Sequence, residues 1–359
     1  MFRIKVDVPL LLGLLILCGV SLLILWSAGG ESQRLIFSQS VRMGVALGGM
    51  IVLAQIRPAS WFRWAPYIFI VGLVMLILVL LIGHTGKGAQ RWLNLGIINF
   101  QPSELMKIGV PMMVAWVLTR KSLPPSNKNL FYATLVLVVP AVLILKQPDL
   151  GTTIMICMSG ALIIFLAGFP WKQISILSVI GAVSMPVVYQ FLHPYQQRRI
   201  NTLFDPWSDP LGDGYHSIQS MIAIGSGGVQ GKGWLEGSQS QLDFVPERHT
   251  DFIFSVFSEE FGFIGVLLLL LLYVCITARG LYIAYYTKDT FSRLLAGSLS
   301  MTFFFYVFVN IGMVAGMLPV VGVPLPLISF GGTSMVTLMA GFGILMGICL
   351  LYTSPSPRD

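Results

Sequence analysis

Long runs of apolar residues, broken by short polar or charged segments, extend over almost the whole chain. A helix needs about 20 apolar residues to cross the hydrocarbon core of a bilayer, so the gaps between charged residues measure the spans. The pattern therefore predicts an all-α polytopic membrane fold with ten spanning helices, whose boundaries are set to within about two to four residues. The expected spans are Val8–Ser27, Phe37–Ile56, Tyr67–Gly83, Ser103–Thr119, Leu130–Leu145, Thr152–Gly168, Gln173–Phe191, Phe261–Ala278, Leu294–Leu318 and Thr333–Tyr352.

The last part of the chain has an interrupted apolar pattern. Leu294–Pro357 contains no charged residue, but Pro319–Gly332 within it is rich in proline and glycine. Neither residue type suits the interior of a helix. This stretch therefore predicts two spans joined by a partly buried loop, and not one continuous helix.

The composition supports a membrane protein and excludes several other classes. Of the 359 residues, 55% are hydrophobic and only 10% are charged, whereas a soluble domain carries about 25% charged residues. A disordered protein, a secreted disulfide scaffold and a nucleic-acid-binding domain are excluded, because none tolerates so much apolar sequence. The four cysteines lie in apolar runs and the four histidines do not cluster, so neither predicts a disulfide framework or a metal site.

The distribution of charge predicts the orientation in the membrane. An even number of spans places both termini on one side, and Lys and Arg concentrate on the cytoplasmic side of membrane proteins. With the amino terminus inside, the inner segments carry nine more basic than acidic residues, and the rest carry two more acidic than basic residues. Both termini are therefore expected in the cytoplasm, and the net charge of +7 needs no nucleic-acid partner to explain it.

On this orientation, the long connection from His193 to Thr250 faces outward. Loops of this length are uncommon unless they have a function. Within it, Tyr215–Ile224 has apolar residues at helical spacing, which predicts a short amphipathic helix at the membrane interface. Ser226–Gly233 imitates a phosphate-binding loop but lacks its first glycine and its final Ser or Thr, so its glycines are interpreted as turn residues.

Two charged residues lie inside the fourth predicted span, where charge is costly and points to a function. Glu104 and Lys107 are three residues apart, so they share one face of the helix and can pair. The pair either locks the helix into the bundle as a structural ion pair or acts directly on a ligand, and the spacing leaves both readings open. Ser103 or its neighbour is expected to cap the start of this helix.

Two aspartates lie near predicted outer ends of spans. Asp149 lies in a short turn with Pro148 and Gly151. In one interpretation Pro148 and Gly151 only shape the turn. In the other, Asp149 holds a cation or a substrate hydroxyl. Asp251 is followed by Phe-Ile-Phe, so partial desolvation would make its carboxylate a better proton acceptor. Its alternative reading is a helix N-cap, a favoured place for aspartate.

Five motifs of this chain resemble, in the same order, those of the SEDS family (shape, elongation, division and sporulation). They are QRWLNLG…QPSELMK (Gln90–Lys107), KQPDLGT (Lys146–Thr152), DPLGDGYHSIQS (Asp209–Ser220), PERHTDFIF (Pro246–Phe254) and NIGMVAGMLPVVGVPLPLISFGG (Asn310–Gly332). The resemblance runs from the first span to the last. It implies a single ten-helix membrane domain over residues 1–352, with a large extracytoplasmic loop at 193–250 between spans 7 and 8. The tail at 353–359 differs from the basic cytoplasmic end that is typical of the family.

The resemblance implies a peptidoglycan glycosyltransferase of the bacterial cytoplasmic (inner) membrane that polymerises lipid II into glycan strands for cell-wall elongation and rod shape. Lipid II would be both donor and acceptor, and undecaprenyl diphosphate would leave as the anomeric centre inverts. The implied protein partner is a class B penicillin-binding protein, the transpeptidase of the elongation complex, and membrane lipids surround both. A divalent cation, Mg2+ or Mn2+, could share the charge of the diphosphate, although the sequence shows no ligand set for it.

The resemblance also implies roles for single residues. Asp251 matches the essential aspartate of the family and would be the catalytic base that takes the proton from the acceptor 4-hydroxyl. The residues expected to bind the substrate, through matching motifs or through their place beside Asp251, are Arg91, Glu104, Lys107, Asp149 and Arg248.

Two other classes of function fit part of the pattern. A lipid II flippase or other transporter would also need an isoprenoid slot, an outward loop and a buried ion pair. It needs access from the inner side, however, whereas the polar groups here gather on the predicted outer face. A non-enzymatic scaffold that only holds the synthase would leave a desolvated Asp251 without a purpose.

Overall fold

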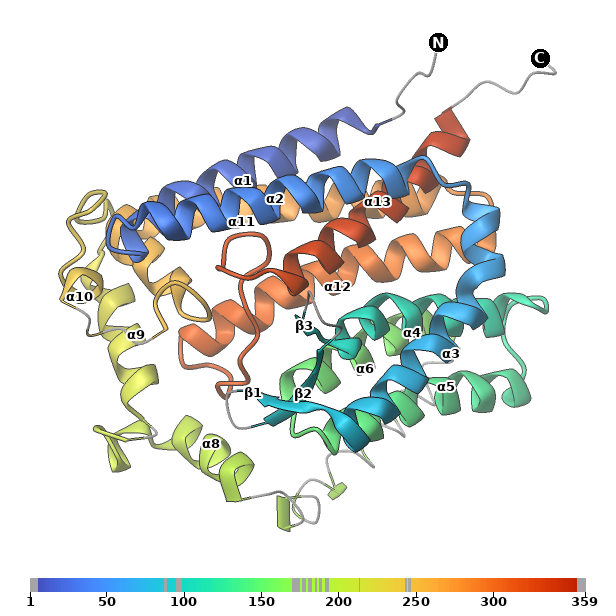
Figure 1. Cartoon of the computed structure of the whole chain (residues 1–359), viewed down its shortest axis with the longest axis horizontal. Coiled ribbons are helices and arrows are strands. Elements are labelled where there is room, and N and C mark those ends of the chain that lie inside the picture. The colour runs from blue at the N-terminus through green and yellow to red at the C-terminus, as the bar shows by residue number, and fades with distance from the viewer. Residues whose placement is uncertain are drawn as a thin grey trace.

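The computed structural model describes residues 6–86, 89–94, 99–169, 194–212, 214–242, 244 and 247–353, with single positions between 175 and 190. These residues form a bundle of helices with one small antiparallel sheet in the order β1-β2-β3 (Figure 1). The helices are α1 (Val8–Ala28), α2 (Gln33–Ala54), α3 (Pro58–Ile82), α4 (Pro102–Thr119), α5 (Asn127–Leu145), α6 (Leu150–Leu166), α8 (Pro194–Phe204), the 3-10 helix η1 (Pro206–Ser208), α9 (Tyr215–Ser226), α10 (Ser238–Gln241), α11 (Ile253–Tyr286), α12 (Thr290–Val314) and α13 (Thr333–Thr353). The strands are β1 (His84–Gly86), β2 (Ala89–Asn94) and β3 (Asn99–Phe100).

Within the described residues, helices occur at nine of the ten predicted spans. Six of them are long and apolar enough to cross a membrane, namely α1, α2, α3, α5, α11 and α12, and α6 is a shorter apolar helix. The chain is therefore a multi-pass membrane protein. The seventh predicted span, Gln173–Phe191, lies mostly outside the described residues, so the total of ten stays a prediction.

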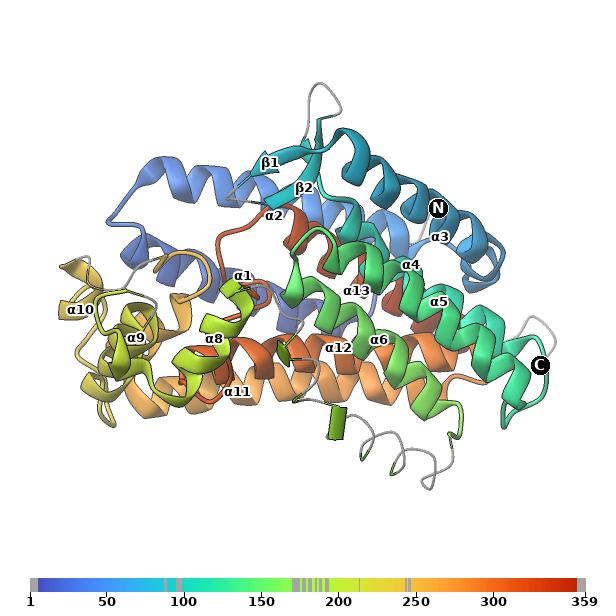
Figure 2. The same cartoon turned by 90° about the horizontal axis from the view of Figure 1, so that it is seen from below.

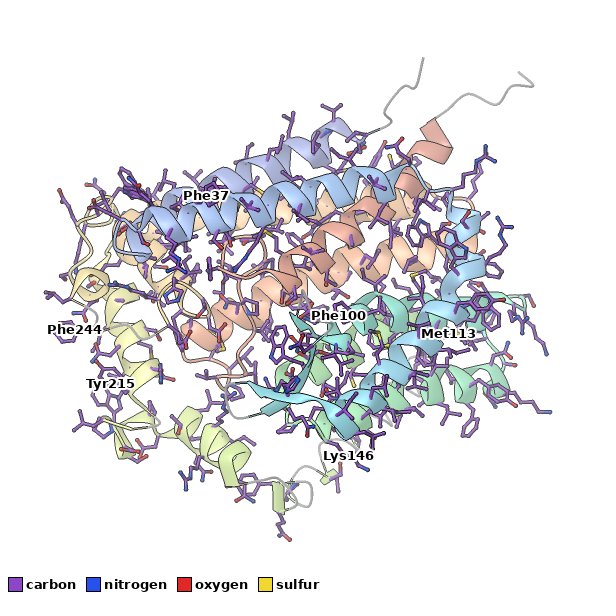
Figure 3. All side chains as sticks on the ribbon, in the orientation of Figure 1. Phe37, Phe100, Met113, Lys146, Tyr215 and Phe244 are labelled. Atoms are coloured by element: carbon purple, nitrogen blue, oxygen red, sulfur yellow. The ribbon has the colours of Figure 1, made fainter. Side chains whose placement is uncertain are left out.

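The long helices follow the long axis of the molecule (Figure 1). α1 begins and α13 ends at one end of the bundle, whereas α8, α9 and α10 lie at the opposite end (Figures 1 and 2). Apolar side chains project from the outside of the helices (Figure 3), and Phe37 on α2 is 73% exposed. An apolar surface of this kind fits contact with lipid. The two described ends of the chain share one side, as an even number of spans requires, and the compartment that they face stays a prediction.

The strands β1, β2 and β3 form a small sheet that the hydrophobic pattern does not predict. The three strands are only three, six and two residues long, which is too short for an alternating pattern to stand out. The start of α4 also differs from the prediction. Its N-cap is Gln101 and no side chain caps it, so the expected Ser103 cap is wrong. Pro102 takes the first helical position, where its fixed φ starts the helix without a cap.

α11 is much longer than the predicted span, because it begins eight residues earlier and ends eight residues later. It passes through a kink at Gly262, where φ is 62°. The predicted helix in the outward connection is confirmed as α9. It packs against α11 and α12, and Ser220 Oγ donates a hydrogen bond to the carbonyl of Val314 at 2.8 Å. The Ser220 hydroxyl is therefore satisfied by the bundle.

The Ser226–Gly233 segment forms turns that lie against the start of α11, which supports its interpretation as a turn. The backbone N–H of Lys232 donates to the carbonyl of Glu259 at 3.0 Å, and Lys232 Nζ pairs with Glu259 Oε1 at 2.7 Å. The Glu259 side chain is fully buried. Gly262 and Gly231 allow this approach, because a Cβ on Gly262 would lie 2.2 Å from the backbone nitrogen of Gly231. The Ser226–Gly233 segment is thus fixed to α11.

A second ion pair joins three helices at the end where α1 begins. Asp7 caps α1 by accepting from the N–H of Leu10 at 3.0 Å. Arg279 on α11 binds the same carboxylate with two hydrogen bonds, at 2.6 Å and 3.2 Å, and Cys349 Sγ on α13 donates to it at 3.3 Å. Two parallel bonds from one guanidinium make this a strong, directional contact.

Candidate active site

The non-helical segment 319–332, between α12 and α13, lies next to the polar groups that were predicted from the sequence. It is partly buried, as expected. Ser329 Oγ donates a hydrogen bond to the carbonyl of Thr250 at 2.7 Å, and the backbone N–H of Phe330 donates to the carbonyl of His249 at 2.9 Å. These bonds fix the residues that directly precede Asp251.

Asp251 lies in the turn that leads into α11, and its side chain is half-buried. Asn310 Nδ2 donates to its backbone carbonyl at 2.9 Å and to the carbonyl of Val323 at 2.7 Å. Its Oδ2 lies 3.6 Å from the place that a Cβ on Gly322 would occupy, and Gly322 has a φ of +70°. A glycine at this position suits both the backbone conformation and the space beside the carboxylate.

The alternative reading of Asp251 as a helix N-cap is wrong. The N-cap of α11 is Phe252, and no side chain makes a capping hydrogen bond there. The reason is the preceding turn, in which the N–H groups of Thr250 and Phe252 both donate to the carbonyl of Glu247. The helix consequently starts one residue too late for Asp251 to cap it, and the carboxylate lies beside segment 319–332.

Glu104 and Lys107 form a buried ion pair, with 2.7 Å between Glu104 Oε1 and Lys107 Nζ. Their side chains are 4% and 11% exposed. Ser334 Oγ on α13 donates to the same glutamate oxygen at 3.1 Å, and Lys107 Nζ lies 5.3 Å from the centre of the Tyr306 ring on α12. The pair thus holds α4 against α12 and α13, as the structural reading predicts.

Lys107 and Tyr306 also line two neighbouring pockets, which keeps the direct reading open. The first pocket is lined mostly by apolar residues of α12 and α13, among them Leu299, Phe303 and Phe342. The second is lined by segment 319–332 and the start of α13. A cation at the edge of an apolar pocket suits a ligand that has an apolar tail and an anionic head.

Asp149 caps α6 by accepting from the N–H of Thr152 at 3.1 Å. Its other oxygen accepts from Gln101 Nε2 at 3.2 Å and lies 3.7 Å from Arg91 Nη1. Arg91 also donates from Nε to the carbonyl of Gln147 at 3.3 Å. Asp149 is therefore already engaged in shaping the turn, while the Arg91 side chain keeps 32% exposure, which is enough to meet a ligand.

The structure brings most of the predicted residues to one segment of the chain. Gly151, in the Asp149 turn, approaches so closely that a Cβ there would lie 2.5 Å from the carbonyl oxygen of Val321, next to Gly322 and hence to Asp251. Lys107 approaches the other half of the segment. Arg248 is placed differently, because its Nη2 lies 3.7 Å from the Cβ position of Gly30 in the α1–α2 turn.

The donor set does not fit a resident divalent cation. Among the residues that the structure describes, no group of three His, Cys, Asp or Glu side chains comes together. The two buried carboxylates of the site are occupied, Glu104 by Lys107 and Ser334 and Asp149 by Gln101 and Thr152. We therefore derive no step through a metal ion.

Several polar residues of the site were not predicted from the sequence as single residues. Asn310, Tyr306 and Ser334 belong to the long charge-free run, where the absence of charge drew attention away from neutral polar groups. All three contact a predicted site residue. The signal that could have identified them is the cost of burying an amide or a hydroxyl in a membrane, which requires a partner.

Comparison with known proteins identifies the family. The family model described as cell cycle protein, which covers FtsW, RodA and SpoVE, matches residues 1–351. The chain belongs to this family. This FtsW, RodA and SpoVE family is the one that the five motifs resemble.

Two kinds of relative support the family assignment. The chain is 51% identical to the peptidoglycan glycosyltransferase MrdB of Escherichia coli K12 over 347 residues, which are 96% of this chain and 94% of that protein. The structure resembles the rod shape determining protein RodA of Thermus thermophilus, with a TM-score of 0.74 and 27% identity over 97% of this chain and 98% of that one. It also resembles a chain of a peptidoglycan synthase complex that coordinates polymerization and crosslinking, with a TM-score of 0.84 and 29% identity over 98% of this chain and 100% of that one.

Proposed function

We propose that this member of the FtsW, RodA and SpoVE family is a peptidoglycan glycosyltransferase that polymerises lipid II into glycan strands for cell-wall elongation. The observation that carries the proposal is the position of Asp251, which is half-buried and has its carboxylate beside segment 319–332. The same segment lines a pocket together with Lys107. The relative that is 51% identical and named a peptidoglycan glycosyltransferase supports the reaction class.

In this mechanism Asp251 is the general base. It takes the proton from the 4-hydroxyl of the acceptor sugar as that oxygen attacks the anomeric carbon of the donor, which inverts from α to β. General-base assistance of this kind is typically worth about 10²–10⁴ in rate. Asn310 supports the geometry, because its amide fixes the backbone of Asp251 relative to Val323. The carboxylate is therefore oriented before the substrate binds.

The leaving diphosphate needs positive charge close to its oxygens. We assign this role to Lys107 and Arg91, with Arg248 contributing from the Asp251 turn. Lys107 is shared with Glu104 and Arg91 with Asp149, so the two carboxylates position these cations. The isoprenoid chain would follow the apolar pocket beside Lys107, and its burial would contribute about 0.8 kcal/mol per methylene.

We further propose that the protein lies in the bacterial inner membrane with both termini in the cytoplasm and with all ten predicted spans. On that orientation Asp251 and segment 319–332 face the outer leaflet. A class B penicillin-binding protein is the proposed partner, supported by the similarity to a chain of a complex that couples polymerization to crosslinking. Crosslinking would then follow polymerisation in one assembly.

Glycan synthesis from purified lipid II tests the function. The wild-type protein, with its penicillin-binding partner, should produce polymer, and Asp251→Asn should reduce the rate at least about 100-fold, because the amide cannot accept the proton. Asp205→Asn is a matched control, since Asp205 is an exposed cap of η1 outside the site. Equal polymer yield from Asp251→Asn and wild type would remove Asp251 from the mechanism.

The same proteins also test the rival functions. A flippase would move a fluorescent lipid II across vesicles without making polymer. A scaffold would leave polymerisation to the partner, so the partner alone would be as active as the complex. Either result would contradict the proposed enzyme.

A further inference from the structure

Arg42 is an intramembrane cation for which the mechanism above has no role. It is the tenth of the 22 residues of α2, about 18 Å from the inner end of that helix at a rise of 1.5 Å per residue. In a hydrocarbon core of about 30 Å this level lies in the outer leaflet. A charged side chain at such a depth is costly and usually marks a ligand or ion pathway.

Arg42 contacts an aromatic ring and, among the residues that the structure describes, pairs with no carboxylate. Its guanidinium carbon lies 4.5 Å from the centre of the Phe330 ring. Within the described part of the chain, its guanidinium forms none of the ion pairs to Asp or Glu. This differs from Lys107, Lys232 and Arg279, each of which is paired with a carboxylate. The charge of Arg42 is therefore available to an anion from outside the protein.

The start of α13 lies beside this guanidinium. A Cβ on Gly332 would lie 3.6 Å from Arg42 Cδ and Nε, whereas a Cβ on Gly331 would meet nothing within 4 Å. The N–H groups in the first turn of a helix have no acceptor within the helix, so they favour an anion. Val336 donates to the carbonyl of Gly332, which places this first turn directly after the two glycines.

The same place adjoins the proposed active site. Gly331 and Ser334 line the second pocket together with Lys107. The backbone of Phe330, which Arg42 contacts through its ring, is bonded to His249, two residues before Asp251. Gly331 thus shares a pocket with Lys107 and directly precedes Gly332, whose Cβ position lies 3.6 Å from Arg42.

A further buried polar atom lies on the same face of α2, one turn before Arg42. Gln39 is fully buried and donates from Nε2 to the carbonyl of Ser329 at 3.3 Å. Its Oε1 has no hydrogen-bond partner within the described residues. A buried acceptor without a donor is costly, but an ionised diphosphate has no proton to donate to it, so Gln39 Oε1 is not part of the anion site.

We propose that Arg42 and the Gly331–Gly332 start of α13 bind the diphosphate of an isoprenoid-linked substrate. This deepens the proposed function and rests on it. A guanidinium fork suits phosphate oxygens better than a single ammonium does, because it donates two parallel bonds. Two phosphoryl groups could reach Arg42 and Lys107 at the same time, which would align the sugar with Asp251.

Variants of two residues test the site by different routes. Arg42→Ala should raise the KM for lipid II about 10- to 100-fold, as expected for the loss of a charge-assisted contact. Arg42→Lys keeps the positive charge, so it should raise this KM less than Arg42→Ala does. Gly331→Ala should also raise KM, because its methyl group fills open space where the anion would approach and meets no protein atom. Arg34→Ala, on the exposed outer turn of α2, is the matched control and should keep the wild-type KM.

Direct binding separates this inference from the proposed function. Farnesyl diphosphate is titrated by calorimetry into wild type and Arg42→Ala in detergent, with farnesol and phosphatidylglycerol as comparison ligands. Wild type should bind the diphosphate, and Arg42→Ala should bind it at least tenfold more weakly. If wild type makes no polymer but keeps this Arg42-dependent binding, the function fails and the site stands.

Two results would overturn the site. Equal binding of phosphatidylglycerol and farnesyl diphosphate would make it a site for lipid headgroups. Unchanged diphosphate binding and KM in Arg42→Ala, with only a lower melting temperature, would reduce Arg42 to a packing partner of Phe330.

Discussion

Neutralising the Glu104–Lys107 pair separates its structural role from its role on the substrate. The two side chains are nearly buried, and 2.7 Å separates their charged atoms. Lys107→Met leaves Glu104 with one neutral donor, Ser334 Oγ at 3.1 Å. Removing one partner of a buried pair typically costs about 3–5 kcal/mol. We therefore expect the free energy of unfolding to fall by about this amount.

The double variant Glu104→Gln, Lys107→Met removes both charges and leaves no buried ion. Replacing a whole buried pair by neutral groups is often close to neutral for stability, so this variant should unfold near the wild-type midpoint. It should nevertheless be inactive, because loss of one preorganised charge-stabilising group costs about 10²–10³ in rate. Stability is measured by thermal unfolding in detergent, and activity by polymerisation of lipid II.

A matched control is the pair at the other end of the bundle. Asp7→Asn, Arg279→Met also replaces an ion pair by neutral groups, but the pair joins α1 to α11 far along the bundle from segment 319–332. It should keep its polymerase activity. If the Glu104–Lys107 double variant folds and polymerises like wild type, Lys107 does not touch the substrate. If Lys107→Met alone is as stable as wild type, the ion pair is not what holds α4 to α13.

Two further predictions concern stability. Burial raises the pKa of Asp7, but hydrogen bonds from Arg279, the Leu10 N–H and Cys349 outweigh that effect, so the pKa lies below its usual value. The ionised carboxylate should therefore add to the free energy of unfolding above about pH 4. This contribution should be lost as the pH falls through the lowered pKa. The melting temperatures of wild type and Asp7→Asn should accordingly differ at pH 7 and begin to converge once the pH falls below about 4, and a gap that does not shrink as the pH is lowered further would contradict this. Gly262→Ala should lower the free energy of unfolding by at least about 1–2 kcal/mol, because φ is 62° and a Cβ would clash with Gly231. Gly225→Ala is the control and should leave the free energy of unfolding unchanged, because the space around Gly225 is open.

Much of the fold could be predicted from the sequence because membrane spans follow from one strong physical constraint. Apolar length alone located helices at nine places, and the proline and glycine content of 319–332 predicted the loop. The β1–β3 sheet and the length of α11 could not be predicted in this way. Strands of two to six residues carry little periodicity, and the kink of α11 depends on the contact of Gly262 with Gly231, 31 residues away in sequence.

The candidate site was predicted in part. Charged residues in apolar surroundings identified Glu104, Lys107 and Asp251, since their cost is visible in sequence. The choice between a cap and a free carboxylate for Asp251 depended on where the first turn of α11 begins, and helix ends are set by local hydrogen bonds that sequence patterns locate only to within a few residues. Arg42 escaped notice for a different reason. Its charge within the predicted span Phe37–Ile56 was visible in the sequence, but it has no charged neighbour there to form a motif, and nothing in the sequence places it beside Phe330.

The attachment of the Ser226–Gly233 segment to α11 bears on how much the protein must reorganise in each catalytic cycle. Glu259 lies only eight residues after Asp251, and its carboxylate and carbonyl are both held by Lys232. The entropic cost of orienting this stretch is consequently met once, when the chain folds, and not again at each turnover. A polymerase that adds many sugars to one strand would benefit from such a permanent arrangement, because the proposed base, Asp251, need not be reoriented between additions.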